Sequence, residues 1–280
     1  MVIIRPISAL IVAIMLLPTV LAAAEDGPPR QTELKGEAKA IAEILENSQA
    51  KLLRDHKVDA VLPLLTDDVK MIFGRGEKPG PYDIVLDRPK IEAMMRAVYH
   101  GKPDAKRKDD FGCPEVDLSG NEATVRHESH STSPKFEEIS AQVVHLRKTK
   151  DGWKVYQSRT WLVYRKYPGK EARYTPEKWK SLDEEVDRCM REGTLYELVA
   201  ALTDACRFNE AYTQAKEMTE EDEHEATAWL WRGYTATALG HMEDARRSYR
   251  RARALDPKAE VPEFVKVAEK KPEPKPVDSE

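Results

Sequence analysis

Apolar residues return every three or four positions near the start of the chain, with charged residues between them. This spacing puts apolar side chains on one face of a helix, so it predicts a long helix after Glu33 and a short one over Val58–Leu65. Lys90–Tyr99 has the same period and predicts a third helix. The apolar positions that define the first and third helices are Ala40, Ile41, Ile44, Leu45, Leu52, Ile91, Met94, Met95 and Val98.

Strand patterns dominate the next part of the chain. Val69–Phe73 and Tyr82–Leu86 flank a turn rich in glycine and proline. Later β-branched and aromatic runs are separated by Ser-Gly-Asn, Ser-Pro and Asp-Gly, residue types that favour hairpin turns. Helices followed by such a meander predict an α+β fold, in which the helices cover one face of a curved antiparallel sheet. The later predicted strands are Glu115–Leu118, Ala123–Ser129, Ile139–Leu146 and Trp153–Tyr164.

From about Tyr174 to Lys270 the pattern is helical throughout. Residues 226–259 place small and aromatic residues at the fixed positions of a unit of about 34 residues, and in this they resemble a tetratricopeptide repeat. The resemblance implies two helices that cross closely at small residues and end near Gly240 and Pro257. The matching positions are Trp229, Gly233, Ala245, Tyr249, Ala252 and Pro257, while Arg232 and Ala236 depart from the pattern.

A weaker copy precedes this repeat, and Glu177–Arg191 predicts one more helix before it. In the copy Ala211 falls on Ala245 and Cys206 falls on Gly240. The resemblance implies that the first helix of each unit lines a concave face that binds peptides. The alternative is that this face packs against the next helix or the first domain. The residues predicted to bind protein are Thr227, Leu230, Tyr234, Thr237 and Tyr196.

The N-terminal segment differs in kind from the rest. Arg5 is its single charged residue, an apolar stretch follows, and Ala22-Ala23-Ala24 precedes an acidic pair. This is the pattern of a secretory signal peptide over 1–24, and it predicts export to a bacterial periplasm or to the medium. An N-terminal membrane anchor is the alternative, because the apolar stretch is almost long enough to span a bilayer.

Composition adds little to this picture. Charged residues make up 34% of the 280-residue chain and apolar residues 41%, with a net charge of −4, as in soluble globular proteins. Basic and acidic residues interleave, so we expect no nucleic-acid binding. The expected organisation is a linker over 25–32, a first domain over 33–168, helical repeats over 174–270 and a disordered tail over 271–280.

Two segments carry a resemblance for the first domain. HKVDAVLPLLTDDVKMIF resembles the second helix and first strand, and VVHLRKTKDGWKVYQSRTW the last hairpin, of the cone fold shared by nuclear transport factor 2, SnoaL-like cyclases and ketosteroid isomerases. The resemblance covers about residues 36–166 and implies a cone-shaped sheet with three helices. It puts Phe73 at the isomerase's catalytic base and His145 at its acid. Because Phe73 cannot accept a proton, we expect that isomerase chemistry to be absent.

Several residues remain candidates for a site in the cone. His145, acting with Glu128 or Tyr156, could supply acid–base catalysis near neutral pH. A pocket in which His145 and a second polar group converge would favour an enzyme. A cone filled by aromatic and aliphatic side chains would favour binding alone. The residues predicted to line a ligand pocket are Phe73, Ser158 and Trp161.

The strand over 124–131 has two polar faces, and the sequence leaves open which one points inward. One face carries Val125, His127 and Ser129, and the other carries Arg126, Glu128 and His130. His127 and His130 lie three apart on a strand and therefore on opposite faces, so we expect no shared metal ion. No cofactor is indicated.

Together these observations favour an exported, non-catalytic binding or scaffold protein. Its cone domain would hold a small ligand or a partner, its repeats would contact protein, and the sheet could form a homodimer. The alternative is a SnoaL-like isomerase, cyclase or hydrolyase that acts on a small molecule in the cone.

Overall fold

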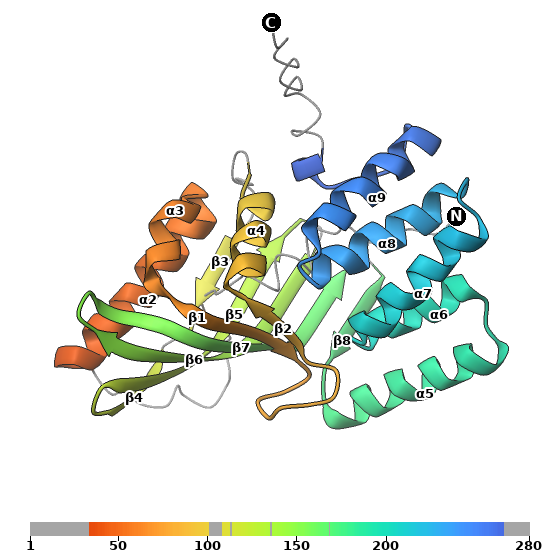
Figure 1. Ribbon diagram of the computed structural model, residues 1–280. Coiled ribbons are helices and arrows are strands. Elements are labelled where there is room, and N and C mark those ends of the chain that lie inside the picture. The colour runs from red at the N-terminus through yellow and green to blue at the C-terminus, as the bar shows by residue number, and fades with distance from the viewer. Residues whose placement is uncertain (1–33, 101–107, 113, 135, 168, 266–280) are drawn as a thin grey trace, which may run out of the picture.

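The computed structural model describes residues 34–100, 108–112, 114–134, 136–167 and 169–265 (Figure 1). Within these ranges the chain forms a curved sheet followed by a helical array. The predicted signal peptide, linker and tail lie outside them. No described helix is long and apolar enough to cross a membrane. The elements are α2 (Gly36–Asp55), α3 (Val58–Val61), a 3-10 turn (Leu62–Leu64), β1 (Leu65–Gly74), β2 (Ile84–Asp87), α4 (Arg88–Val98), β3 (Lys108–Phe111), β4 (Glu115–Ser119), β5 (Glu122–Ser133), β6 (Phe136–Thr149), β7 (Gly152–Tyr167), β8 (Lys170–Arg173), α5 (Pro176–Glu192), α6 (Leu195–Asp204), α7 (Phe208–Glu221), α8 (Ala226–Ala238) and α9 (Met242–Leu255).

The sheet has the strand order β2-β1-β7-β6-β5-β3, with β4 also paired to β5 and β8 to β7. The predicted α+β class and the helix–meander order are confirmed. One part of the prediction is wrong, because β1 pairs with β7 in parallel and the sheet is therefore mixed. β3 and β8 were not predicted: each is four residues long, too short to show an alternating pattern. β8 also carries the sheet past the expected boundary at 168.

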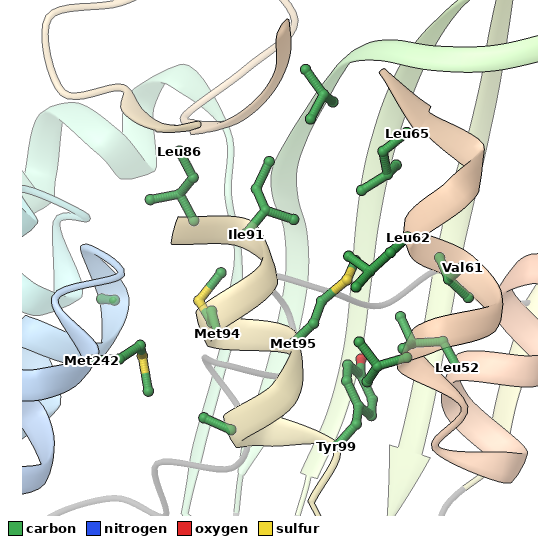
Figure 2. Close-up of a cluster of buried hydrophobic side chains, with 14 of the residues drawn as sticks. Leu52, Val61, Leu62, Leu65, Leu86, Ile91, Met94, Met95, Tyr99 and Met242 are labelled. Atoms are coloured by element: carbon green, nitrogen blue, oxygen red, sulfur yellow. The ribbon is translucent and has the colours of Figure 1, made fainter. Parts of the chain in front are cut away.

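Helices α2, α3 and α4 cover the inner face of the sheet, as the apolar periodicity predicts. Ile91, Met94 and Met95 of α4 are all buried. Figure 2 shows that α4 lies between two groups of side chains, with Met242 of α9 on one side and Leu62 on the other. One continuous hydrophobic core therefore joins the first domain to the helical array.

The helical array repeats with a fixed period. α9 spans Met242–Leu255, and α7 spans Phe208–Glu221, so each end of α9 lies 34 residues after the matching end of α7. The turns before them repeat as well, since Cys206 has φ +55° and Gly240 has φ +70°. Backbone hydrogen bonds from Arg207 N to Leu202 O and from His241 N to Ala236 O, both 2.8 Å, close the two turns in the same way.

The α8–α9 hairpin packs closely where the sequence places its small residues. A Cβ built on Gly233 would lie 2.8 Å from the ring of Tyr249, which is fully buried. Ala245 is also fully buried. A helical hairpin at 226–255 is thus present, with glycine at its closest crossing.

Both array turns dock on the first domain. A Cβ on Gly240 would lie 3.1 Å from Lys90 Cβ and 3.3 Å from Leu86 Cδ2, so the second turn rests on β2 and α4. At the first turn, Arg75 from the β1–β2 loop donates from Nε to Ala205 O at 2.8 Å.

Arg75 also ties α5 to the same loop. Its guanidinium donates to both carboxylate oxygens of Asp183, at 2.7 and 2.9 Å, and lies 4.2 Å from the ring centroid of Tyr82. Arg207 lies on the same tyrosine ring at 5.0 Å and 3.6 Å from Asp183. The hydrogen bonds from Arg75 hold the pKa of Asp183 below its ordinary value.

Replacing Gly233 by alanine tests the close helix crossing. The new methyl group would overlap the Tyr249 ring, so we expect Gly233→Ala to lower the free energy of unfolding by about 1–3 kcal/mol. Gly76→Ala is the matched control, because its new Cβ meets nothing within 4 Å, and it should change stability by less than about 0.5 kcal/mol. Urea unfolding of both variants measures the difference, and equal effects would contradict the packing.

Replacing Asp183 by asparagine tests the Arg75 contact. Because the folded pKa of Asp183 is depressed, its contribution is present above the unfolded pKa and is lost as pH falls through the folded value. We expect Asp183→Asn to cost about 1 kcal/mol at neutral pH and less in acid. Urea unfolding across pH measures this. Asp187→Asn, an exposed carboxylate on the same helix, should show no such trend.

Candidate functional site

The inner face of the sheet is polar along β5, β6 and β7. His127 pairs across the ladder with Gln142, and its Nε2 lies 3.0 Å from Gln142 Oε1. The Gln142 amide in turn donates to Thr160 Oγ1 at 3.1 Å. Of the two faces left open by the sequence, the one with Val125, His127 and Ser129 therefore points inward. His127, Gln142 and Thr160 form a hydrogen-bonded row across three strands, which we call the polar row.

More polar side chains continue this face beyond the polar row. The hydroxyls of Ser129 and Ser140 bond to each other, and Ser131 donates to Asp109 Oδ1 at 2.8 Å. Ser129, Ser131 and Ser140 are each at most 4% exposed. Buried hydroxyls in a sheet are stable only when they find partners, and these three do. The inner face is thus a built polar surface.

The polar row keeps His127 neutral. The imidazole lies deep in the concave face, and this burial lowers its pKa to about 4, against the opposing effect of the Gln142 hydrogen bond. A histidine with this pKa carries no charge at neutral pH, and it is a weak base.

A buried ion pair closes one end of the polar face. Arg165 Nε donates to Glu138 Oε2 at 2.7 Å, and Glu138 is 3% exposed. Arg165 is fully enclosed, and the Glu138 charge helps to hold its pKa above the usual range despite burial. Burial also raises the pKa of Tyr234 on α8 and of Tyr174, which lie near this guanidinium. The pair therefore stands where the sheet meets the helical array.

A cavity of about 50 Å³ lies at this junction. Strands β1, β2, β6 and β7 form its floor, and the first array turn forms its roof. Burial raises the pKa of the Cys206 thiol in this roof to about 11. The lining residues are Phe73, Gly74, Ile84, Ser140, Thr160, Trp161, Leu162, Arg165, Cys206 and Phe208.

The residues predicted to be catalytic lie elsewhere. His145 pairs with Thr124 and accepts or donates at 3.1 Å to its hydroxyl, and three positions separate it from Gln142 on a regular strand, so it points outward. Tyr156 is its ring neighbour, with centroids 6.0 Å apart. Burial, followed by the charge of Arg126, lowers the pKa of His145. Glu128 is exposed. None of the three candidates borders the cavity.

The predicted ligand-binding residues are partly brought together. Phe73 and Trp161 both border the cavity, whereas Ser158 is buried on β7 and does not. Sequence reasoning missed Gln142, Thr160 and Arg165. The alternation of His127, Ser129 and Ser131 along β5 was a readable signal of a polar face, but the partners on β6 and β7 appear only once the register is known.

The residues predicted to bind protein face the interior of the chain at several positions. Thr237 is fully buried, with its hydroxyl 2.7 Å from Gly233 O, and Leu230 is 8% exposed. Tyr234 packs against Phe208 and Trp231, with ring centroids 6.4 and 6.0 Å away. Thr227 and Tyr196 are half-buried. At these positions the face implied for peptides packs within the chain itself.

A second concavity is open to the surface. It has a volume of about 710 Å³ and lies between the end of α2, α3 and the end of α4. Its charged groups pair among themselves, with Arg96 2.7 Å from Asp59 and Lys57 3.0 Å from Asp55. Among the described residues no cluster of His, Cys, Asp and Glu could hold a metal ion.

No family model matches the chain, and no curated protein matches its sequence. Similar solved structures include a nuclear transport factor 2-like protein with a cystatin-like fold from Novosphingobium aromaticivorans, with 19% identity, a TM-score of 0.34, and coverage of 45% of this chain and 82% of that chain. A protein from the same organism, provisionally named a scytalone dehydratase, has 12% identity and a TM-score of 0.39, covering 50% of this chain and 93% of that chain.

A provisionally named ketosteroid isomerase from Parabacteroides distasonis is also similar, with 15% identity and a TM-score of 0.36, covering 48% of this chain and 93% of that chain. The similarity thus spans about half of this chain, and the neighbours carry the fold names that the sequence resemblance implied. At these TM-scores it carries no functional inference, so function is argued below from this chain's own side chains.

The pH dependence of stability tests the state of His127. Because its folded pKa lies near 4 and its unfolded pKa near 6.5, the unfolded chain binds the proton first, and stability falls as pH drops through this window. We expect His127→Gln to remove this loss, although it also alters the bond to Gln142. Urea unfolding between neutral pH and about pH 4.5 measures it. His224→Gln, at an exposed histidine, should leave the loss in place.

Proposed function

We propose that this chain is a binding protein without catalytic activity, and that the cavity at the junction of sheet and array holds a group of its ligand. The single observation behind this proposal is the chemistry of the cavity wall. Its ionisable side chains are Arg165 and Cys206, whose pKa values are both raised. Both keep their protons at neutral pH, so neither can act as a general base.

The size of the cavity supports the same proposal. About 50 Å³ is one third of the engineered cavity of about 150 Å³ that accepts benzene in another protein. A cavity of this size has room for part of a ligand, while a substrate with a reacting centre and a leaving group would need more. Phe73, Trp161 and Phe208 occupy the space around it.

The proposal extends to the helical array. We infer that α6–α7 and α8–α9 are tetratricopeptide-type hairpins, because their bounds repeat after 34 residues and their left-handed turns repeat at Cys206 and Gly240. Protein contact would then use the faces of the array that do not pack on the sheet. Export, through the segment 1–24, and a homodimer through the outer sheet face complete the proposed role.

The alternative remains an isomerase, cyclase or hydrolyase, and the polar row is the observation that favours it. Thr160 stands in the cavity wall and connects through Gln142 to His127. In such an enzyme His127 would replace His145 as the candidate base. Its pKa of about 4 and the intervening amide make proton transfer to the cavity inefficient.

Native mass spectrometry of the purified protein tests the binding proposal. Ile84 borders the cavity and is 5% exposed, whereas the next residue, Val85, is 49% exposed on the same strand. We expect the wild type to carry a small ligand, Ile84→Phe to lose it by filling the cavity, and Val85→Phe to keep it. An unliganded wild type whose thermal unfolding also ignores a panel of small molecules would overturn the proposal. Conversion of a bound compound into another, abolished in His127→Gln, would establish the alternative.

A further inference from the structure

We propose that the junction cavity takes an uncharged, apolar group about the size of a branched aliphatic side chain. This rests on the proposed function, and it names the chemistry of the ligand that the site accepts. The group could belong to a free small molecule or to a residue of a protein partner, and the two sources share the same apolar chemistry.

The polar groups in the cavity wall already have partners in the chain. The Ser140 hydroxyl bonds to Ser129, and the Thr160 hydroxyl accepts the Gln142 amide at 3.1 Å. A ligand that sought hydrogen bonds here would have to displace these partners, at a cost similar to the bond it gains. What these residues present to the cavity is therefore mainly carbon.

Arg165 is the one charged group in the wall, and Glu138 balances it. Its Nε donates to Glu138 Oε2 at 2.7 Å, and its Nη2 lies 2.6 Å from the same carboxylate in an ion pair that lacks hydrogen-bond geometry. The pair leaves the cavity with no net charge to offer an anion. A carboxylate entering here would lose its hydration without a free counter-charge, which disfavours acidic ligands.

The remaining wall is apolar. Phe73, Ile84, Leu162 and Phe208 come from two strands of one sheet edge, from β7 and from α7, and they surround the volume of about 50 Å³. An isobutyl or isopropyl group has about the size that such a space admits, when compared with the benzene-binding cavity of three times its volume. The walls therefore match a branched aliphatic group in both chemistry and size.

Cys206 sets the depth of the cavity from the side of the helical array. Its backbone is left-handed, with φ +55°, and glycine occupies the equivalent place at Gly240. Glycine at 206 would therefore keep the turn conformation while removing a side chain from the cavity roof. This gives a variant that enlarges the site without straining the docked turn.

The test uses the full chain and three probes of similar size, followed by NMR on the aromatic signals of the cavity. The probes are isobutanol, acetamide and acetate. We expect saturable shifts with isobutanol and none with the other two. Ile84→Phe should weaken isobutanol binding by about tenfold or more, while Val85→Phe leaves it unchanged. Cys206→Gly should admit benzene, which the wild type excludes.

The outcomes separate this inference from the proposed function. Preferred binding of acetamide or acetate, lost in Ile84→Phe, would overturn the apolar assignment through Arg165 Nη2 and leave a ligand site standing. Failure of all probes in both wild type and Cys206→Gly would overturn both. Acetyl-leucine amide then distinguishes the sources. Binding about tenfold tighter than isobutanol supports a side chain of a partner, and weaker binding supports a free molecule.

Discussion

Two left-handed turns that dock on the β1–β2 hairpin and α4 are the contact on which the rest of this structure depends. Cys206 and Gly240 take the same backbone conformation 34 residues apart, and each brings the end of a helical hairpin down onto the sheet. Arg75 fixes the first turn through the Ala205 carbonyl, and Leu86 lies under the second. Without this docking the inner face of the sheet would be open to water at its wide end. With it, that end closes over a cavity of about 50 Å³.

The repeat period was the property that the sequence could carry furthest. Small residues at a helix crossing and a left-handed position after a helix are local requirements, so Gly233 and the alignment of Cys206 with Gly240 were readable without a fold. What periodicity could not reveal is the partner of each apolar face. Thr237 and Leu230 lie on a face that packs inside this chain, and nothing in their spacing distinguishes that from a face that awaits a peptide.

The candidate site was harder to predict because the usual sign of an inward face is absent. On β5 both faces are polar, so hydrophobic alternation could not decide between His127 and Glu128. Register decides it, and register on β7 changes at two irregularities, near Ile139–Ser140 and His145–Leu146 of the facing strand. Each shift moves the following residues to the other face of the sheet. Gln142, Thr160 and Arg165 converge only because of those shifts, which the local sequence does not announce.

The polar interior also explains why its cavity is apolar. Burying hydroxyls, an imidazole and an ion pair costs their hydration, and this cost is offset only where each group finds a partner. The chain meets that condition laterally, strand to strand, through Ser129–Ser140, the polar row and Glu138–Arg165. Hydrogen bonds made along the sheet leave little capacity pointing away from it. A ligand approaching from the array side therefore meets methyl groups and rings over a satisfied polar layer, and the selectivity of the site follows from the sheet's own pairing.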